Sequence, residues 1–182
     1  NLILKRTFDI VFSLAVICFI FPWLFPIVAI LITSSGKGPV FFKQKRSGRD
    51  NTEFTCYKFR TMYVNEGADI LQASQHDARI TSVGKYLRKF SIDELPQFFN
   101  VLLGEMTVVG PRPHMLKHTD DYSQVIDRFM VRHFVKPGIT GWAQVKGYRG
   151  ETENTDKMET RINHDLWYME NWTFFLDIKI IF

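Results

Sequence analysis

Apolar residues dominate one long stretch near the start of the chain. The 26 residues from Ile10 to Ser35 carry no charge, and a straight helix of this length would exceed the ~30 Å hydrocarbon core of a bilayer. Pro22 and Pro26 interrupt the stretch, and each removes a backbone N–H from the helical hydrogen-bond ladder. The pattern therefore predicts two apolar arms, Ile10–Phe21 and Ile27–Ile32, with a hinge over the segment between the two prolines.

Basic residues flank this apolar segment on both sides. Lys5 and Arg6 precede it, and five basic residues follow it: Lys37, Lys43, Lys45, Arg46 and Arg49. Under the positive-inside rule both ends then face the cytoplasm, which favours a re-entrant hairpin. The alternative is a spanning helix with a proline kink, which bilayers tolerate when neighbouring groups compensate for the lost hydrogen bonds.

Shorter patterns predict an α+β fold for the rest of the chain, with residues 1–35 as the membrane hairpin and 36–182 as one compact domain. Residues 40–42 and 54–59 are typical of two strands joined by a turn at 47–51. Stretches near Gly110 and from Gly138 to Gly150 read as structured loops. Helical periodicity covers residues 63–75, 94–103, 115–130 and 156–170.

Composition suits a protein at an anionic membrane surface. The chain has 182 residues, 15% of them aromatic, and a formal net charge of +4. No helix-turn-helix, zinc-knuckle or RNP pattern accompanies this charge, so we expect no nucleic-acid partner. Cys18 and Cys56 lie in different settings and indicate neither a disulfide framework nor a zinc site, which fits a reducing cytoplasm.

Candidate chemistry concentrates in the segment Ser91–Pro96, where Asp93 and Glu94 are adjacent. One interpretation is a capping box, in which Ser91 caps a helix and Glu94 reaches back to it. Pro96 disfavours that frame and favours Asp93 as the cap. A carboxylate held beside backbone N–H groups that also suit phosphate oxygens is a candidate for phosphoryl chemistry, so capping and catalysis both stay open.

Several basic side chains could bind phosphate. Arg112 stands out because prolines on both sides, Pro111 and Pro113, restrict its backbone and fix the direction of its guanidinium. Each of the others is compatible with an ordinary solvated side chain. The candidate phosphate-binding residues are Lys58, Arg60, Arg88, Arg112 and Arg149.

Two further patterns carry less information. The aromatic segment 166–175 could lie in a membrane interface or face the core. His114 and His118 stand four residues apart near Asp120 and Asp121, a spacing compatible with a metal ion, but we do not include them among the site residues.

Ordered motifs along the whole chain resemble one family, the bacterial sugar transferases, or monotopic phosphoglycosyl transferases. Besides the proline-broken apolar segment, the matching motifs are residues 5–9 (KRTFD), 38–44 (GPVFFKQ), 58–62 (KFRTM), 77–81 (DARIT), 91–97 (SIDELPQ), 110–113 (GPRP) and 136–141 (KPGITG).

This resemblance implies an enzyme that transfers a sugar 1-phosphate from a UDP-sugar to undecaprenyl phosphate and releases UMP. It implies that Asp93 is the nucleophile that forms a phosphosugar ester, that Glu94 completes the dyad and that Mg²⁺ is the cofactor. Asp93 is the family-matched metal ligand, and Glu105 is a second candidate. Arg112 would hold the nucleotide or its phosphates, with Arg88 and Arg149 as further phosphate ligands.

The resemblance also places the chain at the bacterial inner membrane, with the catalytic domain on its cytoplasmic face, in the first membrane step of exopolysaccharide, capsule or O-antigen synthesis. Residues 147–152 (GYRGET) look more like family members that use UDP-glucose, while UDP-galactose or an N-acetylated UDP-sugar is the alternative. A non-catalytic module that docks on anionic lipids and a lipid phosphatase are the rival functions. Because the chain starts at Asn1 and stops in an apolar run, we expect a longer protein whose other regions could mediate homo-oligomerisation.

Overall fold

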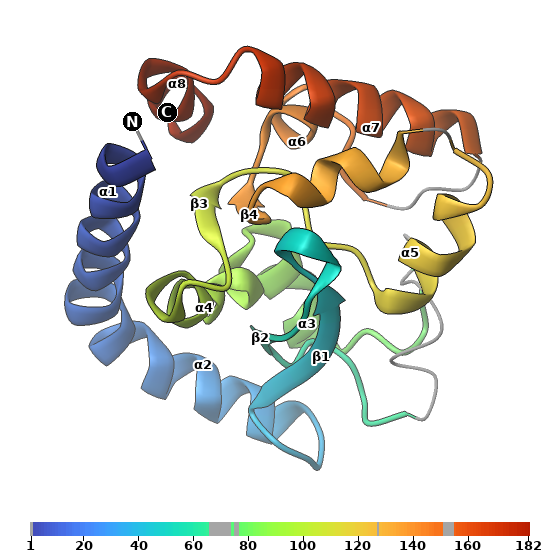
Figure 1. Cartoon of the computed structure of the whole chain (residues 1–182). Coiled ribbons are helices and arrows are strands. Elements are labelled where there is room, and N and C mark those ends of the chain that lie inside the picture. Colours follow the sequence, from blue (N-terminus) through green and yellow to red (C-terminus); the bar gives the residue numbers. More distant parts are fainter. Residues whose placement is uncertain (1, 66–73, 75–76, 127, 151–154) are drawn as a thin grey trace.

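A long, bent N-terminal helix lies along one side of the rest of the chain in the computed structural model (Figure 1). The structure describes residues 2–65, 74, 77–126, 128–150 and 155–182. The bent helix consists of α1 (Leu2–Ala15), a π-helical turn (Val16–Ile20) and α2 (Phe21–Ser35). The helix has 34 residues, and the mean hydropathy of its most apolar 18-residue window is 2.7, so it is long and apolar enough to cross a membrane.

Short strands and helices follow the bent helix. In chain order they are β1 (Phe41–Ser47), β2 (Glu53–Phe59), α3 (Ser82–Lys89), α4 (Gln97–Leu103), β3 (Thr107–Val109), α5 (Leu116–Ser123), β4 (Gly138–Thr140), α6 (Trp142–Val145), α7 (Thr155–Glu170) and α8 (Phe174–Ile181), with 3₁₀ segments at Arg49–Asn51, Ile92–Glu94 and Phe129–Phe134.

The bend lies at the π-helical turn and not between the two prolines. The N–H of Phe21 donates to the carbonyl of Val16, five residues back, and α2 then continues through Pro26. The predicted hinge over residues 22–26 is therefore wrong in its position. The π turn accommodates one extra residue just before Pro22, whose missing N–H interrupts the hydrogen bonding of the continuous Leu2–Ser35 helix at this point.

Charged side chains fasten α1 to the domain. Arg6 donates to the carbonyls at the end of α4, and the buried carboxylate of Asp9 accepts from the N–H of Val108 at 2.9 Å. Lys5 pairs with the buried Asp177 of α8 at 2.6 Å. The residues that the sequence places as a basic flank thus also form specific contacts between α1 and the domain.

Two small sheets make the fold α+β, as the sequence predicts. The predicted hairpin is confirmed: β1 and β2 pair antiparallel, with Phe41 opposite Phe59 and Ser47 opposite Glu53. A second pair, β3 and β4, is parallel. These strands have three residues each and lie where the sequence predicted loops, because such short strands show no hydrophobic alternation.

The predicted helices differ in accuracy. The helix expected at 156–170 is α7, and the one expected at 94–103 is α4, which begins only at Gln97. The helix expected at 115–130 ends at Ser123, and Arg128 adopts a left-handed conformation (φ 65°) before the next 3₁₀ segment. The prediction at 63–75 falls largely outside the described residues.

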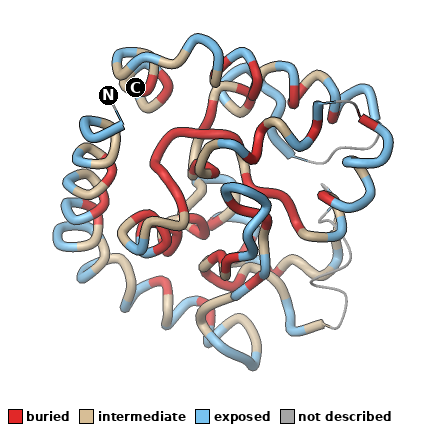
Figure 2. Tube along the Cα trace, viewed as in Figure 1, coloured by how far each residue is buried: buried red, intermediate tan, exposed pale blue. Residues whose placement is uncertain are grey.

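Buried residues gather where α4, β2 and β3 meet, between the bent helix and α7 (Figure 2). A second cluster joins α7 to the segment before β4, and a third packs α2 on β2 and α3. Stacked rings connect the third cluster: Phe25 lies 5.6 Å from Phe41 and Phe41 5.6 Å from Phe59, between ring centroids. This contact fixes the β1–β2 hairpin against the apolar helix.

The aromatic segment 166–175 fits each of its two interpretations in part. Leu166 and Tyr168 are buried in the core, and Trp167 stacks on Trp142 with 4.8 Å between ring centroids. Phe175 of α8, in contrast, is 84% exposed. Of its ten residues, two are buried, three are half-buried and five are exposed, so the segment is divided between the core and the surface.

Candidate active site

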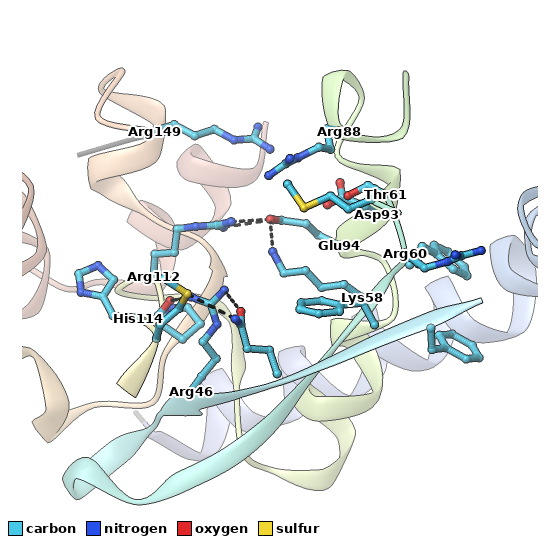
Figure 3. A pocket seen from close by; sticks show the side chains of 18 of the residues that line it. Arg46, Lys58, Arg60, Thr61, Arg88, Asp93, Glu94, Arg112, His114 and Arg149 are labelled. Carbon is cyan, nitrogen blue, oxygen red and sulfur yellow. Dashed lines mark hydrogen bonds and ion pairs between the residues drawn. The ribbon is translucent and has the colours of Figure 1, made fainter. Parts of the chain in front are cut away.

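A cavity of about 570 Å³ lies between the β1–β2 hairpin, the Ile92–Glu94 turn, the loop after β3, α5 and α7. Figure 3 shows the two acidic residues in this cavity with basic side chains around them. Four of the five predicted phosphate-binding residues, Lys58, Arg88, Arg112 and Arg149, contribute side chains near the carboxylates (Figure 3).

The Ile92–Glu94 turn positions the two carboxylates. Ser91 adopts a left-handed conformation (φ 58°), and its carbonyl accepts from the N–H of Glu94 at 3.1 Å. Neither predicted capping arrangement occurs, because Ser91 makes no side-chain cap and Pro96 itself precedes the first residue of α4. Neither carboxylate therefore caps a helix. Both residues are buried, with 7% of Asp93 and 6% of Glu94 exposed.

Glu94 is fixed by two basic side chains. Arg112 donates to both of its carboxylate oxygens, and Lys58 donates to Oε1 at 2.8 Å. Burial alone would raise the pKa of Glu94, but Arg112 and Lys58 outweigh burial and hold the pKa well below its usual range. Glu94 is therefore an ionised carboxylate whose oxygens are already engaged.

Asp93 is in a different state. Burial raises its pKa, Lys58 opposes this shift, and the negative charge of Glu94 adds to it. Among the residues that the structure describes, its carboxylate forms no ion pair. A raised pKa makes the ionised form more basic, so Asp93 is the carboxylate that remains available to a metal ion or an electrophile.

Two arginines flank the dyad on one side of the cavity (Figure 3). Arg149 donates to the hydroxyl of Ser91 at 2.7 Å. Arg88 has a buried Nη1 without a partner in the described part of the chain. A buried guanidinium N–H without an acceptor is costly, so this position favours an anionic ligand.

Hydrogen bonds to three backbone carbonyls hold the loop that carries Arg112. The carbonyl of Pro111 accepts from the N–H of Gly138 at 2.8 Å. The carbonyl of Arg112 accepts from Arg132 at 2.6 Å, and the carbonyl of Pro113 accepts from Arg46 at 3.3 Å. The sequence predicted rigidity from the prolines alone, whereas the structure adds a hydrogen bond at each of these three carbonyls.

Two predicted site residues have other partners. Arg60 borders the cavity, but its guanidinium points away from the dyad and donates to the carbonyls of Gly36 (2.7 Å) and Lys37 (2.6 Å) after α2 (Figure 3). Glu105 is not among the cavity-lining residues, and its carboxylate accepts from the side chain of Asn100 at 2.6 Å. In both cases the side chain is engaged by backbone carbonyls or a buried amide nearby, and its predicted role stays a prediction.

Magnesium fits the dyad through Asp93 alone. No group of three or more histidine, cysteine or acidic residues suited to a metal lies within the described ranges. Mg²⁺ is commonly bound by one or two carboxylates together with substrate phosphates and water, so the available carboxylate of Asp93, in a cavity lined with basic side chains, is compatible with this ion. The ring of His114 has another partner, because Nη1 of Arg132 lies 2.8 Å from its Nε2.

Sequence reasoning missed a buried cluster behind the Arg112 loop. Arg132 and Asp165 form an ion pair at 2.7 Å with only 3% of each side chain exposed, and Arg161 lies one helical turn before Asp165. The signal was present, since Arg161 and Asp165 follow the spacing of the core residues Met158 and Ile162 on α7. Charged residues at core positions of an amphipathic helix are candidates for a buried function.

The class is that of a protein with a basic cavity around an asymmetric acidic pair, next to a helix apolar enough for a membrane; these features suggest membrane association and suit anionic groups. The particular family is shown by sequence. Residues 1–182 match the model of the bacterial sugar transferase family, and the chain belongs to it.

Relatives with assigned functions match along the whole chain. It is 50% identical to the UDP-glucose:undecaprenyl-phosphate glucose-1-phosphate transferase of Klebsiella pneumoniae over 100% of this chain and 39% of the relative, and 49% identical, with the same coverage, to the enzyme of that name from Escherichia coli (strain K12). It is 43% identical to the UDP-N-acetylgalactosamine-undecaprenyl-phosphate N-acetylgalactosaminephosphotransferase of Aeromonas hydrophila, over 98% of this chain and 42% of the relative. The chain thus spans about two fifths of the length of these relatives.

Proposed function

We propose that the protein transfers glucose 1-phosphate from UDP-glucose to undecaprenyl phosphate and releases UMP. The observation that carries this proposal is the asymmetry of the dyad: Arg112 and Lys58 occupy the carboxylate of Glu94, while that of Asp93 remains available. The relatives at about 50% identity bear the name of this reaction, which favours glucose over N-acetylgalactosamine. Of the motif that suggested UDP-glucose, residues 151 and 152 lie outside the described residues.

The proposed reaction has two steps. A carboxylate oxygen of Asp93 forms a bond to the sugar-linked phosphorus of the donor, the bond from that phosphorus to the bridging oxygen breaks, and UMP leaves with the electron pair. A phosphate oxygen of the lipid then forms a bond to the same phosphorus and displaces Asp93. The covalent intermediate divides the transfer into two steps, so the site binds the soluble donor in the first step and the membrane-bound acceptor in the second.

Within this scheme the other side chains have distinct tasks. Glu94 holds Arg112 and Lys58 in place, and these cations offset the charge of the phosphates. Arg88, whose Nη1 is free among the described residues, and Arg149 are positioned to bind phosphate oxygens. When bound at Asp93, Mg²⁺ would shield the negative charge of the pyrophosphate.

The bent helix is proposed to enter the cytoplasmic leaflet and return, so that both of its ends face the cytoplasm. Apolar side chains on its outer surface support this, among them Val11 (61% exposed), Trp23 (79%) and Ile30 (65%), while the opposite surface packs on the domain. In bacteria this places the domain on the cytoplasmic face of the inner membrane. Single cysteines at Leu4 and Asn51, in a Cys18→Ser background, should react with a membrane-impermeant reagent from the same side, and labelling from opposite sides would exclude a re-entrant helix.

The decisive experiment is to trap the first step. We expect UDP-glucose and Mg²⁺, without lipid, to add one hexose phosphate to the protein, seen by intact-protein mass spectrometry after acid quenching. Asp93→Asn should lack this adduct yet keep its melting temperature, because the side chain of Asp93 makes no ion pair in the described structure. An adduct that persists in Asp93→Asn and disappears in Glu94→Gln would reverse the two roles.

A panel of UDP-sugars separates the proposed activity from its rivals. UMP release that requires undecaprenyl phosphate for repeated turnover supports the transferase and identifies the sugar. Release of inorganic phosphate from the lipid, without nucleotide, would instead indicate a phosphatase. Binding to anionic vesicles with no UMP from any donor would indicate a docking module.

A further inference from the structure

Arg161 on α7 is a buried cation that the proposed reaction does not yet use. The residue is 6% exposed, and it lines the cavity at the side formed by α5 and α7. Its neighbours along α7, Met158 and Ile162, are core residues with at most 1% exposure. Arg161 therefore comes from a core position of α7 and also borders the cavity.

Arg161 has no acidic partner within the described ranges. Asp165, one turn along α7, pairs with Arg132 at 2.7 Å. The Nη2 of Arg161 donates to the carbonyl of Gly150 at 3.0 Å, and its Nε is buried without any acceptor. A buried guanidinium with an unused donor needs an anion to balance it.

The charges around Arg161 reinforce this need. Its pKa is lowered to about 10, first by burial and then by the neighbouring guanidinium groups of Arg112 and Arg132. Arg112 is balanced by Glu94, and Arg132 is balanced by Asp165. Among the described residues, Arg161 is thus the buried cation at this side of the cavity that forms no ion pair with a carboxylate.

The position of α7 identifies which phosphate it would meet. Figure 1 shows α2 and α7 on opposite sides of the molecule. On the α2 side, Phe41 lines the cavity and stacks on Phe25 of the apolar helix, so a lipid acceptor would approach there. The opposite wall, which carries Arg161, is left for the water-soluble donor.

We propose that Arg161 binds the uridine-linked phosphate of the donor, the group that departs as UMP. The inference rests on the proposed function. When the bridging P–O bond breaks, the electron pair stays on the oxygen of UMP and its phosphate gains a negative charge. The guanidinium of Arg161 neutralises that charge through its unused Nε, while Nη2 keeps its bond to Gly150.

The test compares the binding of UMP and of uridine by calorimetry on the detergent-solubilised protein. We expect Arg161→Gln to weaken UMP binding about 10-fold or more, equivalent to ~1.4 kcal/mol, and to leave uridine binding unchanged. Arg161→Lys keeps the positive charge but loses the planar guanidinium. Its affinity for UMP should lie between those of the wild type and Arg161→Gln. Lys157→Gln removes one exposed charge from the same helix and should bind UMP as the wild type does.

Equal UMP affinity in Arg161→Gln and the wild type would overturn the proposal. If Arg161→Gln does not fold, Arg161→Lys decides through the same ratio of UMP to uridine affinity, and an unchanged ratio again refutes the role. A wild type that binds UMP through Arg161 but releases none from any UDP-sugar would refute the proposed function and leave the phosphate site standing.

Kinetics provide a second readout that a purely structural role would not move. In Arg161→Gln the inhibition constant for UMP should rise together with the KM for the donor, while the KM for undecaprenyl phosphate stays constant. A parallel change in the KM values of both substrates would indicate general damage to the fold and count against a specific phosphate contact.

Discussion

At the scale of single residues, the site depends on how many donors each basic side chain offers. Arg112 makes a two-pronged contact with Glu94, and its own carbonyl is held by Arg132. Lys58 contacts the same carboxylate through one donor. Guanidinium geometry is therefore needed at position 112, whereas a point charge is enough at position 58.

Arg112→Lys should reduce turnover about 10-fold or more, or ~1.4 kcal/mol in activation free energy, because lysine keeps the charge but cannot hold both oxygens of Glu94. Steady-state UMP release measures this. The matched control is Arg128→Lys, in an exposed pair with Glu170 at 3.4 Å, which should retain full turnover. Normal activity in Arg112→Lys would show that the two-pronged contact of the Arg112 guanidinium with Glu94 has no catalytic importance.

His133 should make the protein less stable in acid. Burial, and then Arg132, lower its pKa from 6.5 to about 4, so the folded state prefers the neutral ring. The folded protein keeps this stability above pH 6.5, and loses it progressively as the pH falls towards and through 4. Melting temperatures from pH 7 to 4 should therefore fall less steeply for His133→Gln than for the wild type, and parallel curves would contradict the assignment.

At the scale of elements, the attachment of α1 depends on a carboxylate buried against β3. Asp9 accepts from the N–H of Val108 and from the hydroxyl of Thr107. Asp9→Ala leaves both donors buried and unpaired, so we expect a loss of about 1–3 kcal/mol in the free energy of unfolding. Denaturation in detergent would measure it. Glu53→Ala, at an exposed pair with Lys45, should change stability by less than about 1 kcal/mol.

The π-helical turn makes a prediction about the path of the apolar helix. Pro22→Ala combined with Pro26→Leu restores two N–H donors and should favour one straight α-helix, which is long enough to span the bilayer. Labelling of cysteines at Leu4 and Asn51 should then shift from the same side to opposite sides. Pro39→Ala, outside the helix, is the control. Unchanged labelling would show that packing of α2 on Phe59 and Leu87 fixes the bend without the prolines.

At the scale of the whole molecule, the sequence predicted the elements with strong periodicity, such as α7 and the β1–β2 hairpin. It missed β3 and β4, because three-residue strands owe their pairing to distant partners. In the site, the Asp93–Glu94 pair and Arg112 were found from local motifs. Arg161 was not singled out, since its lack of a carboxylate partner among the described residues depends on the pairing of Asp165 with Arg132, which no local pattern indicates.

The docking of the bent helix has a consequence for how the two substrates are encountered. Lys5, Arg6 and Asp9 bind α1 to the domain, and Arg60 binds the end of α2. The bent helix is therefore a rigid bracket, which means that it is attached to the domain at both of its ends. A bracket lying in one leaflet would confine the cavity to a fixed height, so the lipid acceptor would be met by diffusion in a plane and the nucleotide donor by diffusion in volume. The rate of encounter with the acceptor would then depend on its surface density in the leaflet. Dilution of the surrounding solution would lower only the rate of encounter with the donor.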